Sequence, residues 1–172
     1  MNEEIFPIVD IEGNVTGQAT RSECHSGSKI LHPVVHLHIL DKDGYLYLQK
    51  RSDKKDIFPN LWDTAVGGHI DFGETPEKAV VRETREELNL SGLDIKYIGK
   101  HIIETPLERE LTYCFYAITQ QTPQPDMFEV SDGKFWSIPK IKANLKKGIF
   151  TPNFEQDFAS FLSENLNKYI LF

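Results

Sequence analysis

Cysteine is scarce in this sequence, which holds only two among its 172 residues. Cys24 and Cys114 cannot build a disulfide framework, and neither stands at a spacing typical of metal ligands. We therefore expect two free thiols. Cys114 lies inside an apolar run, which predicts a small buried side chain.

Long apolar runs and an excess of basic residues are also missing. No stretch approaches the roughly 20 apolar residues that span a bilayer, and the start MNEEIFPIVD resembles no secretory leader. We expect a cytoplasmic protein without a membrane partner. The net charge of −7 argues against a nucleic-acid partner, because phosphate contacts need clustered Lys and Arg. An anionic small molecule can still bind where a divalent cation reverses the local field.

The length and composition predict one globular domain with a substantial core. Hydrophobic residues make up 40% of the 172 positions, and they include eleven Phe and six Tyr. We predict a single domain over 1–172. Within it we expect an N-terminal hairpin and loop in 1–30, the core in 31–140 and a C-terminal helix in 150–172.

Strand patterns dominate the chain. Short β-branched stretches around Gly13 predict a hairpin, and 18–32 reads as polar and irregular. In 34–40 two histidines alternate with apolar residues, which predicts a half-buried strand that turns at 41–44 and returns as a hairpin partner over 45–50. Further strands are expected at 94–103, 111–118 and 134–138.

The clearest helix is expected from about Pro76 to Leu88. Thr75 suits an N-cap, Pro76 suits the first helical position, and Asn89 tolerates the left-handed conformation just beyond the end. A second helix is expected over 154–169, where aromatic and aliphatic residues recur at helical spacing. The fold class is therefore α/β (α+β), with helices packed on a mixed sheet.

Three carboxylates share one face of the first helix, because Glu83, Glu86 and Glu87 are spaced i, i+3, i+4. Their mutual repulsion is offset if they bind a hard divalent cation such as Mg²⁺. The alternative is a merely solvated acidic face. The neighbouring arc is predicted to face the core and contains Val80, Val81, Thr84 and Leu88.

Residues around the acidic face favour the metal site over the solvated face. Gly67 and Gly68 allow a close backbone approach before the helix. Arg82 is placed to pair with an upstream carboxylate such as Glu74 and to hold the loop against the helix.

The stretch from Gly68 to Leu90 resembles the Nudix box, G-x5-E-x7-R-E-U-x-E-E-x-G-U, where U is a bulky aliphatic residue. Every charged position matches, while Thr84 replaces an aliphatic residue and Asn89 replaces a glycine. The resemblance implies a Nudix fold, an α/β/α sandwich with a mixed β-sheet, in which the box at 68–90 forms loop-helix-loop and binds Mg²⁺ or Mn²⁺.

The resemblance also implies roles for single residues. Glu83, Glu86 and Glu87 would be metal ligands together with the Gly68 carbonyl, while Arg82, Glu74 and Gly67 would support the catalytic set. The metal would polarise phosphoryl oxygens and lower the pKa of an attacking water. The general base varies within the family, and we prefer Glu83, with Glu110 second.

The surroundings of the box resemble type I isopentenyl-diphosphate isomerase from about Leu31 through Glu110. The residues with counterparts there include His32, Arg51, Lys55, Pro59, Trp62, Gly68, His69, Glu108 and Glu110. In those isomerases the histidines and glutamates at these positions bind a metal, so Glu108 is a further candidate ligand. The alternative is that His69 is a loop residue and His32 a strand-edge residue.

Hydrolysis is favoured over isomerisation, because the isomerases need a cysteine where this chain has Gly67, which carries no ionisable group. We therefore expect a Nudix hydrolase of the isomerase-like subgroup, cleaving a diphosphate linkage in a nucleoside diphosphate-linked or related small molecule. The alternatives are an isomerase-like activity and a non-catalytic nucleotide-binding sensor.

Candidate substrate contacts come from the cationic and aromatic residues near the box. Arg51, Lys55 and His69 are candidates for binding substrate phosphate, although Arg51 and, more so, Lys55 could also be ordinary surface cations. Trp62 and Phe58 could stack on a ring or belong to the core. The N-terminal hairpin and the C-terminal helix offer surfaces for a homodimer.

Overall fold

A single long strand, β3 (Leu31–Leu40), runs through the middle of this computed structural model, which describes residues 3–128 and 130–163. It pairs in parallel with β8 (Arg109–Ile118) and antiparallel with β6 (Val66–His69). Within the described residues the mixed sheet has seven strands, in the order β5-β4-β3-β8-β7, with β6 on β3 and β9 on β4. The remaining bounds are β4 Leu46–Arg51, β5 Trp62–Asp63, β7 Lys96–Glu104 and β9 Val130–Trp136.

The prediction that this strand is half-buried is wrong, because all ten residues of β3 are buried. Val35, Leu37 and Ile39 pack on one face, as the alternation indicates. His36 and His38 point to the other face. That face is covered by the helix near the C-terminus and is not exposed to solvent. Their polar rings are accommodated there by the buried carboxylate of Asp157.

The predicted hairpin over 34–50 forms only at its turn. The Asp41 amide donates to the Tyr45 carbonyl at 3.0 Å, but the two strands are paired only at Leu40 and Leu46. Beyond this point β4 turns away and pairs with β5 and β9. The edge of β3 that β4 leaves open is taken by β6, which brings Gly67 and Gly68 into the sheet.

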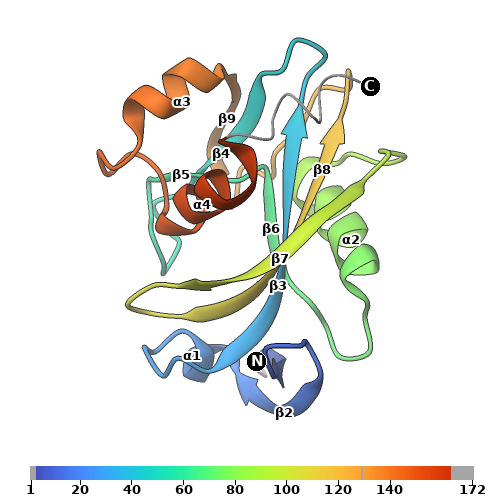
Figure 1. Cartoon of the computed structure of the whole chain (residues 1–172), viewed down its shortest axis with the longest axis vertical. Helices are drawn as coiled ribbons and strands as arrows, with labels where there is room; N and C mark the ends of the chain where they lie inside the picture. Colours follow the sequence, from blue (N-terminus) through green and yellow to red (C-terminus); the bar gives the residue numbers. More distant parts are fainter. Residues whose placement is uncertain (1–2, 129, 164–172) are drawn as a thin grey trace.

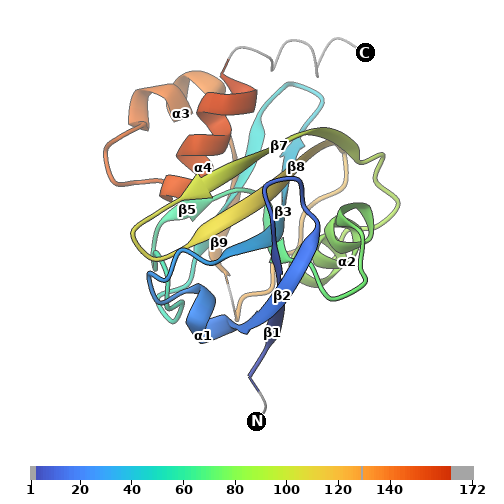
Figure 2. The ribbon, with the colours of Figure 1, turned by 60° about the horizontal axis from the view of Figure 1, so that its bottom comes forward.

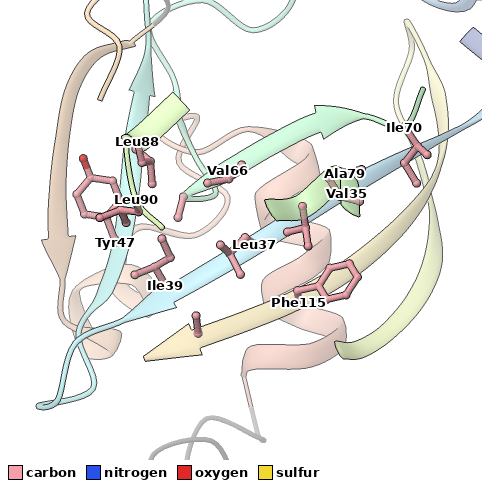
Figure 3. Close-up of a cluster of buried hydrophobic side chains, with 13 residues drawn as sticks. Val35, Leu37, Ile39, Tyr47, Val66, Ile70, Ala79, Leu88, Leu90 and Phe115 are labelled. Atoms are coloured by element: carbon pink, nitrogen blue, oxygen red, sulfur yellow. The ribbon is translucent and has the colours of Figure 1, made fainter. Parts of the chain in front are cut away.

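Helix α2 (Pro76–Leu88) has the predicted bounds. The Thr75 side chain accepts from the Lys78 amide, and Asn89 ends the helix with φ 51°. The buried side includes Val80 and Leu88, and it packs against the sheet in the core cluster of Figure 3. Val81 was wrongly assigned to this side: it is 57% exposed, because one residue further along a helix is a turn of about 100°.

The opposite face of the sheet is covered by α4 (Pro152–Asp157) and the π-helical turn η1 (Phe158–Leu162). Figure 1 shows α2 and α4 on opposite sides of β3, which gives the predicted α/β/α layering. The helix predicted over 154–169 is thus shorter and partly π-helical, and its part from 164 onward lies outside the described residues. Helix α3 (Ile138–Asn144) was not predicted.

The N-terminal segment packs against the start of β3 (Figure 2). The predicted hairpin is present as β1 (Ile5–Val9) and β2 (Val15–Thr20), with Gly13 in the turn at φ 98°. The segment predicted to be irregular contains the short helix α1 (Arg21–Cys24), which is fixed by a capping box between Thr20 and Glu23.

The prediction from the scarcity of cysteine agrees with the structure. Cys24 and Cys114 are both buried free thiols. Among the helices of residues 3–128 and 130–163, none has the length and apolar character to cross a membrane.

Candidate metal and phosphate site

A cavity of about 480 Å³ opens beside the acidic edge of α2. It is bounded by α2, β6, the N-terminal segment and the start of α4. The structure gathers nearly all residues singled out in the sequence on its wall. Those lining it are Arg51, Lys55, Gly67, Gly68, His69, Arg82, Glu83, Glu86, Glu87, Glu108 and Glu110.

Arg82 organises the acidic edge of the cavity. Its Nε and Nη2 donate to the two carboxylate oxygens of Glu74 at 3.0 and 2.8 Å, which makes a bidentate pair. Nη2 also donates to the carbonyl of His69 at 3.0 Å. Glu74 lies behind the cavity wall, and its pKa is lowered chiefly by the Arg82 hydrogen bonds. The arginine thus ties the loop before the helix to the helix itself, as predicted.

The same guanidinium faces the carboxylates of the helix. Nη1 lies 2.7 Å from Glu83 and 3.2 Å from Glu86. Burial raises the pKa of Glu83 in spite of this contact. Glu87 accepts from the Gln49 amide at 2.8 Å, which fixes the third carboxylate. Carboxylate oxygens are the kind of ligand that Mg²⁺ prefers, and the Gly68 backbone packs against Glu83.

Three imidazoles meet beside the cavity, at its neighbouring wall: His25 and His69 line it, whereas His32 is fully buried and does not. The Nε2 atoms of His25, His32 and His69 are buried and have no hydrogen-bond partner among the described residues. One ring nitrogen from each lies within 4.8 Å of the others. Burial is the main reason why the pKa values of all three are lowered, that of His25 to about 4. Two of them have only longer contacts to carboxylates, His25 to Glu108 at 3.6 Å and His32 to Glu110 at 4.0 Å. Neutral ring nitrogens without a hydrogen bond fit a transition-metal ion.

His25 was not found from the sequence. It lies in the segment predicted to be irregular, and nothing in its spacing marks it as a ligand. Phe6 from β1 stacks on the His69 ring at 3.8 Å between centroids, so the N-terminal segment also holds the imidazoles in place.

Two buried carboxylates complete this wall. Glu108 and Glu110 form a second candidate group of metal ligands with His32. Asn153, at the start of α4, donates to Glu108 at 3.2 Å and to Glu110 at 2.8 Å. Burial first, and the neighbouring Glu108 second, raise the pKa of Glu110 to about 8. A carboxylate pair that shares a dry site in this way gains from a bound cation.

Two candidate phosphate-binding residues are Arg51, the last residue of β4, and Lys55, in the loop between β4 and β5. The Nε of Arg51 donates to the Ile57 carbonyl, and Nη1 lies 3.3 Å from Asp63, so the guanidinium is held by the loop. Lys55 and Phe58 also line the cavity, whereas Trp62 does not. Trp62 packs edge-on against Trp136 in the second core cluster. It is therefore a core residue and does not stack on a ligand ring in the cavity.

The described cavity lining contains no thiol. Cys24 belongs to a small cluster with Phe6 and Ala19, and Cys114 faces Asp157 under the C-terminal helix. Burial raises the pKa of both thiols. Gly67 therefore has no substitute cysteine nearby for proton transfer at carbon.

Comparison with known proteins gives a consistent result. Residues 30–155 match the family model of the NUDIX domain. The chain is 44% identical over 87 residues to an uncharacterised Nudix hydrolase of Nostoc, a match that spans 51% of this chain and only 52%, about half, of that relative. It is 29% identical to an isopentenyl-diphosphate Delta-isomerase of Streptomyces griseus, over 86% of this chain and 78% of that protein.

Solved structures resemble the fold as well. The crystal structure of the Deinococcus radiodurans protein DR0079 has a TM-score of 0.74 and 27% identity, covering 86% of this chain and 92% of that chain. The NUDIX domain of Shewanella oneidensis NrtR, solved with ADP ribose, has a TM-score of 0.60 and 21% identity, covering 81% and 88%.

Proposed function

This chain belongs to the Nudix family of hydrolases, and from that premise we propose that it cleaves a diphosphate linkage in a nucleoside diphosphate-linked or related small molecule with the help of Mg²⁺ or Mn²⁺. The observation that carries the proposal is the acidic edge of α2. There Glu83, Glu86 and Glu87 line one cavity, and Arg82 joins the first two of them to the loop.

The carboxylates of the helix would hold the cation, together with the Gly68 carbonyl. The bound cation would polarise the phosphoryl oxygens and lower the pKa of the attacking water. Glu83 is the preferred base that would take the proton from this water, because it lines the cavity at the acidic edge of the helix. Glu110 is the second candidate.

Arg51 and Lys55 would bind the phosphate groups from the facing loop. Arg51 is already oriented by Ile57 and Asp63, so its binding requires little further ordering. The cavity of about 480 Å³ is in the size range of small-molecule sites and suits a diphosphate with an organic group attached. The ADP ribose bound by the NrtR domain is one compound of this class.

A second cation would be held by the histidine wall. His25, His32 and His69 supply nitrogen ligands, and Glu108 and Glu110 supply oxygens. The orphaned ring nitrogens support this assignment, because buried polar atoms without partners are otherwise costly. Nitrogen-rich ligation favours a transition metal over Mg²⁺.

Isopentenyl-diphosphate isomerisation is the second candidate function. The histidine wall and the similarity to the Streptomyces griseus isomerase favour it. Gly67 and the lack of a thiol in the described cavity lining weigh against it. A nucleotide sensor without catalysis is the third candidate, and the complete set of box carboxylates weighs against that one.

The test is a substrate screen of the purified full chain with Mg²⁺ or Mn²⁺. The panel contains nucleoside di- and triphosphates, nucleotide sugars, ADP ribose and isopentenyl diphosphate. We expect phosphate or a phosphorylated product from at least one, with loss in EDTA and a fall on the order of 100-fold or more in Glu86→Gln and Glu87→Gln.

Two other outcomes would redirect the assignment. Isomerised isopentenyl diphosphate would establish the second candidate. Tight binding of a nucleotide without any turnover would establish the sensor.

A further inference from the structure

A buried carboxylate behind the cavity contacts three histidine side chains. Asp157, at the end of α4, is fully buried. Its Oδ2 lies 2.6 Å from His36 Nδ1 and 3.2 Å from His38 Nε2, and its Oδ1 lies 2.7 Å from His101 Nε2. No part of the cleavage chemistry described above uses this cluster, although it lies directly under the sheet that carries the site.

One member of the cluster reaches the cavity. His36 lies opposite Gly67 in the β3–β6 ladder and lines the cavity, whereas His38, His101 and Asp157 do not. A Cβ built on Gly67 would lie 3.4 Å from His36 Cδ2 and 3.6 Å from Nε2. The His36 ring therefore reaches from the buried Asp157 cluster to the cavity. Its Nδ1 points inward to Asp157, and its Nε2 edge faces the cavity floor beside Gly67.

The carboxylate sets which ring nitrogen carries a proton. Asp157 accepts the Nδ1 hydrogen, so the ring is fixed in orientation. Burial lowers the pKa of His36, but the charge and hydrogen bond of Asp157 outweigh it and raise the value to about 9, with smaller contributions from Glu110 and Asp63. In this charged form Nε2 carries a hydrogen as well. Among the described residues, no acceptor is hydrogen-bonded to it.

We propose that His36 contacts the substrate through Nε2, donating a hydrogen bond to a diphosphate oxygen at the cavity floor, and that Asp157 is the residue that positions it. The proposal rests on the proposed function, because it requires a phosphate-bearing ligand. A substrate phosphate would lie close to the carboxylates of Glu108 and Glu110, so it needs a hydrogen-bond donor at the buried end of the cavity to offset their repulsion. Arg51 and Lys55 approach from the loop, and His36 supplies the donor from the sheet.

The absence of a side chain at position 67 follows from the same geometry. A larger residue there would lie over Nε2 and separate it from the ligand. Gly67 thus leaves the edge of the otherwise buried His36 imidazole uncovered toward the cavity, at the place where an isomerase would carry its thiol. The residue at position 67 therefore bears on hydrolysis and isomerisation at once: glycine leaves room for His36 on β3, and it removes the cysteine that isomerisation needs.

A metal ion is not needed to explain the cluster. His38, Cys114 and Asp157 have ligand atoms close together, but both Asp157 oxygens already accept from His36 and His101 at normal hydrogen-bond distances.

The direct test is NMR of the histidine rings in the wild-type full chain with Mg²⁺, before and after addition of methylenediphosphonate, a diphosphate that cannot be hydrolysed. We expect the Nε2 resonance of His36, assigned from the spectrum of His36→Gln, to shift on binding. The amide of Gly68 reports that the cavity is occupied. A shift at Gly68 without one at His36 would overturn the inference and leave the proposed function intact. No shift at either would count against both.

Kinetics of matched variants supply the second test. With the substrate found in the screen, kcat/KM should fall roughly ten- to a hundredfold in His36→Gln and stay within about twofold in His101→Gln, which loses an equally short bond to Asp157 outside the cavity. Asp157→Asn should lower kcat/KM in wild type and add little in the His36→Gln background. Equal effects of His36→Gln and His101→Gln would mean that the cluster is purely structural.

Discussion

Gly68 packs so closely against the Glu83 side chain that a Cβ at position 68 would overlap the glutamate's Cγ, Cδ and Oε1. The backbone of β6 and the first carboxylate of the helix are therefore fitted to each other. A glycine at 68 is required by the side chain opposite it, since its φ lies outside the left-handed range.

We expect Gly68→Ala to remain folded and to lose activity by about 100-fold or more, because the Cβ displaces the Glu83 carboxylate that we propose binds the metal, and this carboxylate is the free end of a flexible side chain. Gly17→Ala is the matched control, since the nearest atom to its Cβ would be Ile8 Cδ1 at 3.8 Å. Steady-state kinetics and thermal unfolding measure the two effects. Full activity in Gly68→Ala would refute the assigned role of Glu83.

Replacing Arg82 by Lys should lower activity about 10- to 100-fold at unchanged charge. Lysine is a point charge and cannot keep the bidentate contact with Glu74 and the bond to the His69 carbonyl at once. Arg85→Lys, on the same helix but away from the cavity, serves as the control. Equal activities of the two variants would show that charge alone suffices at position 82.

The contribution of Glu110 to the stability of the metal-free protein should fall as the pH rises from the ordinary Glu pKa of 4.5 to about 8. In this window folded Glu110 keeps a proton that the unfolded chain has lost. The folded state therefore binds more protons, and the free energy of unfolding decreases with pH. Urea unfolding in EDTA should show a shallower fall in Glu110→Gln. Identical slopes in both proteins would contradict the raised pKa.

Asn89→Ala should cost about 1–2 kcal/mol, because alanine is strained at the observed φ of 51°. Asn89→Gly should be close to neutral: glycine accepts the conformation but loses the hydrogen bond to Gln124. Chemical unfolding of the two variants measures the difference. A similar cost for both would assign the role of Asn89 to its side-chain bond.

Local signals explain which predictions from the sequence succeeded. The bounds of α2 are decided by Thr75, Pro76 and Asn89, all of which act within a few residues of the helix ends. The acidic edge follows from the same helix, since residues at i, i+3 and i+4 share a face whatever the rest of the chain does. The contact between Arg82 and Glu74 joins residues only eight positions apart.

Contacts between distant segments explain what was missed. Whether β3 is buried on one face or both depends on α4, which follows much later in the chain. His25 and Asn153 reach the cavity from opposite ends of the sequence, and no spacing between them indicates this. The partnership of His36 and Asp157 is likewise visible only once the helix is packed on the sheet.

The N-terminal segment carries Phe6, Arg21 and His25 into the cavity wall, yet it precedes the range 30–155 that defines the family. Part of the cavity wall is therefore supplied by chain that lies outside the family range. Changes in the first 29 residues can alter which ligand is accommodated while the helix carboxylates stay as they are. A truncation at the family boundary would keep the cleavage residues and open one side of the chamber in which they work.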